Sequence, residues 1–213
     1  MFELDAIAVR VLGSLIEKEI TTPDNYPLTL SALVAACNQT SNRDPVLALN
    51  EAAVSESLED LARRSLVRGV HRSDWRVRRY RQLLSESLNL HAAETAVMCV
   101  LMLRGAQTTG EIRARAARLF EFVDLAQVDV TLEALMDLPT PLVAELARRP
   151  GQKEARYTHL LSGEPQEEAS GPALAVDPAA TDRVEALEQA VDSLRAEVAE
   201  LRARLEAFVR EFQ

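Results

Sequence analysis

The chain has 213 residues, 47% of them apolar, which is enough for two compact domains with buried cores. Its net charge of -9 is unevenly distributed, because residues 1–84 are neutral, residues 85–163 carry -2 and residues 164–213 carry -7. The overall acidity therefore does not exclude nucleic acid as a partner of the first part, since salt screens charges beyond about 10 Å.

The sequence favours a cytoplasmic protein. The longest apolar run covers residues 96–103, far short of the roughly 20 residues that span a bilayer, and the first residues do not resemble a signal peptide. Cys37 and Cys99 lie in apolar helical stretches, where a free thiol behaves as a small hydrophobic group. We expect reduced cysteines and no membrane partner.

Three helices are predicted in the first part of the chain. Asp5 is placed to cap the first helix, in which apolar residues recur at helical spacing over residues 7–16. After a turn rich in Thr, Pro and Asn, Thr29 is placed to cap a short second helix. Residues 51–64 predict the third helix, with its apolar side facing inward.

A change of period follows the third helix. Two β-prone runs, at 66–71 and 75–82, predict a hairpin. The second part of the chain repeats the order, and Thr108 with Glu111 has the pattern of a capping box. Its expected elements are helices beginning near Ala93, Thr108 and Gln127, followed by strands at 142–147 and 155–161.

Two internal repeats support this interpretation. The string V-x-x-x-L-E-x-L occupies residues 54–61 and again 128–135, and R-Y-x-x-L-L occupies 79–84 and 156–161. Three helices followed by a hairpin are typical of a winged-helix domain. The predicted fold is mainly α with small β-hairpins (α+β). Its expected parts are tandem winged-helix domains at 1–84 and 85–161, a flexible acidic linker at 162–181 and a C-terminal coiled-coil helix at 182–213.

The last segment has the clearest periodicity. Apolar residues alternate at spacings of three and four, with Val at a and Leu at d, which favours a parallel two-stranded coiled coil and hence a homodimer. The predicted dimerisation residues are Val184, Leu187, Val191, Leu194, Val198, Leu201 and Leu205. An antiparallel pair, or a helix folded back on its own chain, stays open as an alternative.

No catalytic or metal-binding pattern stands out. The histidines, His71, His91 and His159, lack ligand spacing to another His, Cys or paired acid. Nothing places a base beside Cys37, and the scattered glycines form no phosphate-binding loop. We therefore expect a non-enzyme without a metal or a cofactor.

A cluster of arginines marks the first predicted hairpin. From Arg63 to Arg81 there are eight arginines and one acid, Asp74, with Trp75 and Tyr80 interleaved. Arginine forks pair with phosphate oxygens or enter a narrow minor groove, so the hairpin is a candidate nucleic-acid contact. The candidate residues are Arg68, Arg72, Arg76 and Arg78. The alternative is a strand face that is simply solvated.

The polar segment 38–45 is a second candidate. Asn42 and Arg43 suit contact with bases or phosphates, and we include both in the predicted nucleic-acid site. A turn bonded to itself is an equal alternative, since Asn and Asp form such loops routinely. The third helix is a poorer candidate, because Glu56 and Glu59 would repel phosphate.

The string C-N-Q-T-S-N-R-D-P at 37–45 resembles the signature of the YceH-like family of uncharacterised bacterial proteins. L-R-G-A-Q-T at 103–108 and R-Y-T-H-L at 156–160 are similar to that family in the second half. The resemblance covers nearly the whole chain and implies two winged-helix domains in a bacterial cytoplasm. It implies no activity and no catalytic residues.

These patterns lead to one hypothesis and one rival. The first is a dimeric, non-catalytic protein that binds double-stranded DNA, acts in regulation and uses the arginine-rich hairpin. The rival is a scaffold of the tandem winged-helix type that binds a protein partner and no DNA, which the acidic third helices favour. An enzyme is a distant third class and would need perturbed acids around a deep pocket.

Overall fold

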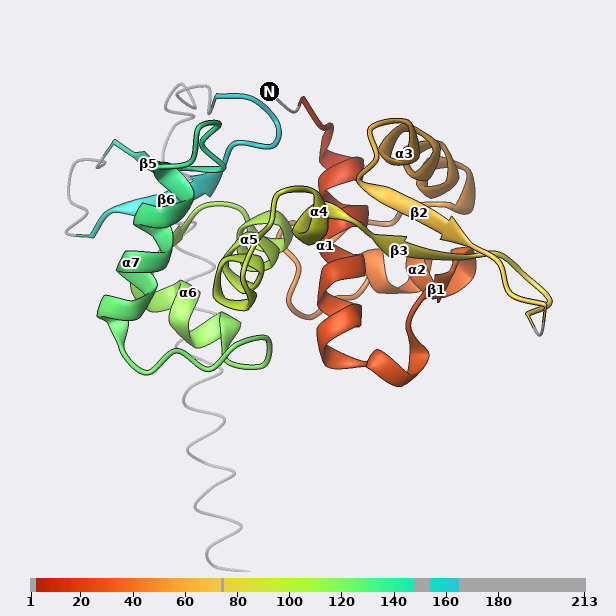
Figure 1. Cartoon of the computed structure of the whole chain (residues 1–213), viewed down its shortest axis with the longest axis horizontal. Helices are drawn as coiled ribbons and strands as arrows, with labels where there is room; N and C mark the ends of the chain where they lie inside the picture. Colours follow the sequence, from red (N-terminus) through yellow and green to blue (C-terminus); the bar gives the residue numbers. More distant parts are fainter. Residues whose placement is uncertain (1–2, 74, 148–153, 165–213) are drawn as a thin grey trace, which may run out of the picture. The chain divides into compact units, whose positions relative to one another are not determined.

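A computed structural model describes residues 3–73, 75–147 and 154–164. Helices dominate, and the strands form two small antiparallel sheets of three strands each (Figure 1). The predicted linker from residue 165 onward and the predicted coiled-coil segment, with all seven dimerisation residues, lie outside the described residues. Within the described ranges, no helix combines the length and the apolar character needed to cross a bilayer.

The first repeat has the predicted order of helices and strands. Its elements are α1 (Ala6–Thr21), the 3-10 turn η1 (Pro23–Asn25), β1 (Leu28–Thr29), α2 (Leu30–Cys37), α3 (Glu51–Arg63), β2 (Val67–Val70) and β3 (Arg79–Gln82). Both predicted caps are present, because Asp5 Oδ1 accepts from Ala8 N at 2.7 Å and Thr29 Oγ1 accepts from Ala32 N at 3.2 Å. The short helix α4 (Leu84–Ser87) follows the repeat.

The second repeat has the same succession of elements. They are α5 (Ala92–Arg104), β4 (Gln107–Thr108), α6 (Thr109–Ala116), α7 (Leu125–Met136), β5 (Val143–Leu146) and β6 (Arg156–His159). The predicted capping box is confirmed, since Thr108 Oγ1 accepts from Glu111 N and Glu111 Oε2 accepts from Thr108 N. Each repeat therefore follows one plan of helix, short strand, two helices and hairpin.

The two sheets share one topology. Their strand orders are β1-β3-β2 and β4-β6-β5, so the last strand of each repeat is central. Tyr80 lies opposite the first residue of β1 and the third residue of β2, and Tyr157 has the corresponding position between β4 and β5. Both rings are half-buried, so the repeated R-Y-x-x-L-L string places the two tyrosines at equivalent positions. The edge strands β1 and β4 were not predicted from the sequence, because two residues are too few to show a period.

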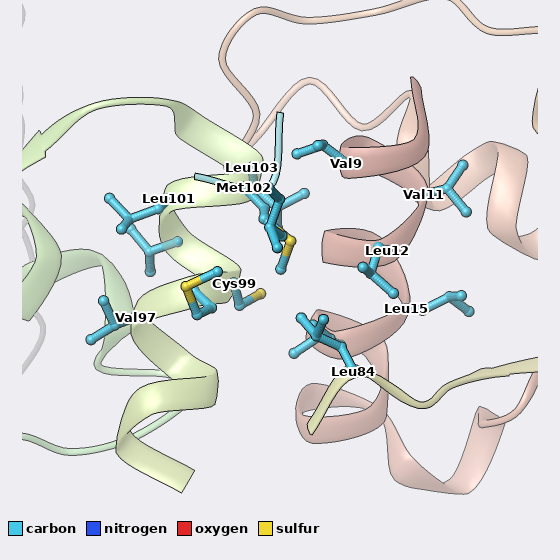
Figure 2. Close-up of a cluster of buried hydrophobic side chains, with 14 of the residues drawn as sticks. Val9, Val11, Leu12, Leu15, Leu84, Val97, Cys99, Leu101, Met102 and Leu103 are labelled. Atoms are coloured by element: carbon cyan, nitrogen blue, oxygen red, sulfur yellow. The ribbon is translucent and has the colours of Figure 1, made fainter. Parts of the chain in front are cut away.

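The repeats share one continuous core, built where α1 packs against α5. Figure 2 shows apolar side chains of both helices filling the space between them. Gly13 permits this approach, since a Cβ there would lie 3.0 Å from Leu103 Cδ2, and Cys99 Sγ lies 3.5 Å from the Gly13 carbonyl oxygen. Residues 8–17 are all buried, because α2 and α3 cover the other side of α1.

Candidate nucleic-acid interface

The arginine-rich hairpin consists of β2, β3 and the connection between them. Figure 1 shows it extending beyond the helices of the first repeat. Antiparallel pairing places Arg68 opposite Arg81, with Val67 and Gln82 as the next pair toward the core. Val67 and Gln82 are buried, so this end anchors the hairpin while the other end projects into solvent. All four predicted arginines of this hairpin, Arg68, Arg72, Arg76 and Arg78, are exposed.

Trp75 organises the connection between the two strands. Its backbone N–H donates to the Arg72 carbonyl oxygen at 3.0 Å, which closes a turn. The guanidinium groups of Arg72 and Arg79 lie over the indole, 5.2 and 4.8 Å from the ring centroid. Arg79 also donates to the Pro27 carbonyl oxygen at 3.1 Å. Arg79 is thus part of the hairpin's framework, while Arg72 is exposed and also contacts the ring.

The remaining arginines of the region divide into paired and unpaired groups. Arg63 and Arg64 contact Asp60 at 3.1 and 2.7 Å, and Arg81 forms an ion pair with Glu86. Arg68, Arg76 and Arg78 have no ion pair with any described acid. Three exposed guanidinium groups in this hairpin are therefore free to bind an anionic partner.

Helix α3 presents the opposite charge beside this hairpin. Glu51, Glu56 and Glu59 are exposed along this helix, whereas Val54 and Leu58 are buried on its opposite side. Phosphate oxygens near these carboxylates would be repelled. The geometry therefore favours contact through the hairpin rather than through a helix inserted in the major groove.

The second predicted contact segment is a loop bonded to the fold. Asn38 holds it closed, since its Nδ2 donates to the Leu49 carbonyl oxygen at 2.8 Å and its Oδ1 accepts from Leu49 N at 2.7 Å. Asn42 has a positive φ of 58° and accepts from Arg104 Nη2 at 3.1 Å. Arg43 points into the protein and its side chain is fully buried. The self-bonded turn is thus the alternative that this loop adopts, and Arg43 is not part of the exposed arginine surface.

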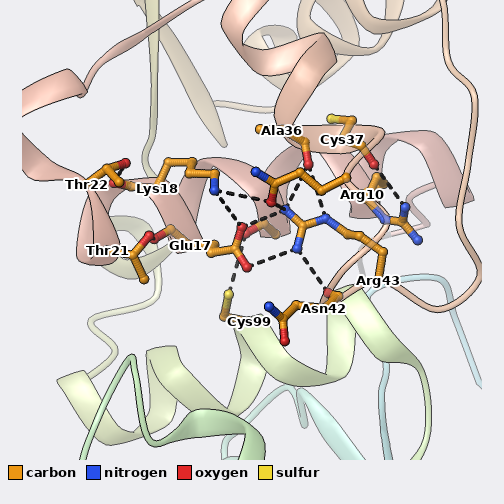
Figure 3. Close-up of polar contacts among 12 residues, drawn as sticks. Arg10, Glu17, Lys18, Thr21, Thr22, Ala36, Cys37, Asn42, Arg43 and Cys99 are labelled. Carbon is orange, nitrogen blue, oxygen red and sulfur yellow. Dashed lines mark hydrogen bonds and ion pairs between the residues drawn. The ribbon is translucent and has the colours of Figure 1, made fainter. Parts of the chain in front are cut away.

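Glu17 of α1 is the acceptor for the buried Arg43. Arg43 Nη1 donates to Glu17 Oε1 at 2.9 Å and Arg43 Nη2 donates to Glu17 Oε2 at 2.6 Å (Figure 3). Arg43 Nη2 also donates to the Ala36 carbonyl oxygen at 2.8 Å. Lys18 Nζ lies 3.4 Å from Glu17 Oε2, and Arg118, which follows α6 in the second repeat, forms a further ion pair with Glu17. The Glu17 carboxylate therefore joins both repeats. We call Glu17, Lys18, Arg43 and Arg118 the Glu17 cluster.

Electrostatics keep the Glu17 carboxylate ionised. Burial by itself would raise the pKa of Glu17, but the hydrogen bonds and charge of Arg43, with added attraction from Arg118 and Lys18, hold that pKa below its ordinary value. A buried charge of this kind requires such partners. The cluster is a buried ionic junction between the two repeats.

No local pattern in the sequence marks this junction. Glu17 follows Leu15 and Ile16 but is itself followed by Lys18 and Glu19, so in the sequence it resembles the start of a solvated charged stretch. The partner could not be named, since Arg43 is 26 residues away and Arg118 is 101 residues away.

Both cysteines are free and buried. Burial raises the pKa of both thiols, that of Cys99 to about 12, so both are protonated at neutral pH. Among the described residues, no group of three His, Cys, Asp or Glu side chains is placed to hold a metal ion.

Known proteins resemble this chain over most of its length. A family model described as "Protein of unknown function, DUF480" matches residues 4–152. A protein of Chromobacterium violaceum named "UPF0502 protein" is 47% identical over 203 residues, which cover 95% of this chain and 92% of that protein. Neither description states an activity, a ligand or a partner.

Proposed function

This chain belongs to the DUF480 family of proteins of unknown function, which agrees with the resemblance seen in its sequence, and we propose that it is a non-catalytic, DNA-binding regulator. In this proposal it is a cytoplasmic homodimer with tandem winged-helix domains. The arginine-rich hairpin of the first repeat contacts double-stranded DNA.

The order of elements supports the winged-helix assignment. In each repeat the third helix is followed by a hairpin, and a short strand before the second helix completes a three-stranded sheet. The hairpin of the first repeat then corresponds to the wing. Fold analogy alone gives no function, so the argument rests on the surface of this hairpin.

The exposed arginines carry the proposal. Arg68, Arg76 and Arg78 have no described acid as a partner, and Arg72 is exposed in the same hairpin, against the Trp75 ring. Guanidinium groups on a projecting hairpin can follow a phosphate backbone and release its condensed counterions. The acids of α3 limit base reading, so we expect affinity that depends on charge more than on sequence.

Dimerisation would strengthen such a surface. The heptad segment, which lies outside the described residues, would place two hairpins on one molecule. Two weak contacts joined in this way bind more tightly than either one, because the second contact forms at high effective concentration. The DNA-binding proposal and the dimer proposal therefore support each other, but each can be refuted without refuting the other.

A salt titration tests the DNA contact. We expect full-length protein to bind a mixed-sequence duplex in fluorescence anisotropy, with log affinity falling against log salt by about 0.9 for each phosphate contacted. Arg76→Ala should reduce the slope by about one unit if Arg76 contacts one phosphate. Arg113→Ala removes the same charge from an exposed position of the second repeat and should leave the slope unchanged.

The rival function is a protein-binding scaffold without DNA contact. The exposed Glu56 and Glu59 of α3 favour it, since acids line the surface that a recognition helix would turn to DNA. No binding at 50 mM salt, or unchanged binding after substitution of Arg68, Arg72, Arg76 and Arg78 together, would decide for the scaffold.

A further inference from the structure

Helix α7 is the counterpart of α3, but its exposed side has different chemistry. Exposed or half-exposed acids of α3 are replaced by apolar residues at three positions of α7. Aligned by the V-x-x-x-L-E-x-L string, the pairs are Glu51 with Leu125, Glu56 with Val130 and Asp60 with Ala134. The inward residues of the string are the same in both helices, so the repeats diverged on their outer surfaces.

Exposed large apolar side chains are concentrated on α7 and just before it. Val123 is 78% exposed, Leu125 47% and Val130 63%, and they are three of the five large hydrophobic residues that are exposed in the described part of the chain. Ala126, Val130 and Ala134 recur at spacings of four along α7, and with Val123, which lies just before the helix, they form the exposed apolar surface that we call the α7 stripe.

The start of the α7 stripe is held rigidly. Val123 N donates to Gln127 Oε1 at 2.9 Å, and the Val123 carbonyl oxygen accepts from Arg113 Nη2 at 2.8 Å. Asp124 caps the helix by accepting from Gln127 N at 2.8 Å. The valine side chain is thus presented to solvent by a fixed backbone, which lowers the entropy lost on binding.

The surroundings of the α7 stripe are acidic. The segment 119–147 that carries the stripe contains six acids and no Lys, Arg or His, and one basic side chain of α6, Arg113, contacts it at the Val123 carbonyl oxygen. Asp129 and Glu133 are exposed one helical turn apart and lie along one side of the stripe. This charge repels DNA phosphates, and it also opposes pairing of the stripe with the same surface of a second copy.

We propose that the α7 stripe docks a basic amphipathic helix of a partner protein. The small side chains Ala126 and Ala134 let a second helix approach closely, with its apolar residues against Val130. Lysine or arginine residues along the edge of that helix then pair with Asp129 and Glu133. The inference does not depend on DNA binding, because it uses a different surface in the second repeat.

A set of three synthetic peptides tests this pairing with the full-length protein. The probe is an 18-residue helical peptide with leucines along one side and lysines beside them. One control has glutamate in place of lysine, and the other has the lysines kept and the leucines scrambled. We expect anisotropy to show binding of the probe, and binding at least about tenfold weaker for each control, or about 1.4 kcal/mol.

A matched pair of variants locates the contact. Leu125→Glu with Val130→Glu gives α7 the acids that α3 has at these positions, so folding should be retained and a thermal melt should confirm it. The double variant should lower affinity for the probe at least about tenfold. Glu56→Val in α3 makes the reverse exchange and should leave the affinity unchanged.

Four results would overturn the proposal. They are no binding of the probe up to about 1 mM, equal binding of the glutamate peptide, probe affinity retained in the folded double variant, and a loss of oligomer mass in that variant without peptide. The last result would show that a second copy covers α7. None of these results depends on the DNA titration, so the two proposals are tested separately.

Discussion

Replacement of Glu17 by alanine should be among the most destabilising single changes in this chain. The side chains of Glu17 and Arg43 are both fully buried and joined by two hydrogen bonds, at 2.9 and 2.6 Å. Removal of the carboxylate leaves the Arg43 guanidinium without a counter-charge, and breaking one side of such a buried pair costs about 3–5 kcal/mol. Lys18 and Arg118 would then repel Arg43 as well.

Urea unfolding at pH 7 measures this loss directly. On a total stability of about 5–15 kcal/mol, the change is large enough to shift the midpoint strongly at an unchanged slope. For a unit of this size, a loss of 3–5 kcal/mol also lowers the melting temperature by roughly 6–20 °C. Glu17→Gln keeps the shape and one acceptor, and should lose less than Glu17→Ala.

An apolar double variant separates the charge from the packing. Glu17→Leu with Arg43→Met removes both charges and fills a similar volume, so it should be more stable than either Glu17→Ala or Arg43→Ala. A loss below about 1 kcal/mol for Glu17→Ala would refute the argument, because it would place this carboxylate in a solvated environment.

Two further predictions concern pH and assembly. Burial lowers the pKa of His159 to about 4, from an ordinary value of 6.5, so the folded state binds fewer protons between these values. The contribution of neutral His159 to stability is then fully present above pH 6.5 and is lost as the pH falls toward 4. Urea unfolding should show a loss of about 2 kcal/mol in the free energy of unfolding from pH 7 to pH 5, and His159→Gln should reduce that loss. Deletion of residues 182–213 should convert a dimer into a monomer without unfolding the repeats, and light scattering that shows an unchanged mass would exclude the coiled coil.

Local signals predicted the elements of this fold well, and their ends less well. Asp5, Thr29 and Thr108 cap helices as expected, because capping depends on side chains within three residues. The hairpin strands are shorter than predicted, since the connection is organised around the ring of Trp75 instead of continuing the ladder.

The exposed residues of the candidate site could be predicted from the sequence. Contacts between residues that are far apart in the chain could not. The exposure of Arg76 follows from its place near the tip of a hairpin. The polar neighbours that in the sequence favour a surface position for Arg43 in fact close a loop around it. Its partner Glu17 is brought close only by the packing of α1, which no local pattern reports.

The contact between α1 and α5 bears on how this chain arose. These helices are the first of each repeat, so the repeats meet through equivalent surfaces, as the subunits of an isologous homodimer do. A single repeat would leave one side of α1, including Leu12 and Gly13, in water until a second copy covered it. The present arrangement is the one that duplication and fusion of such a homodimer would produce, with α3 and α7 then free to diverge.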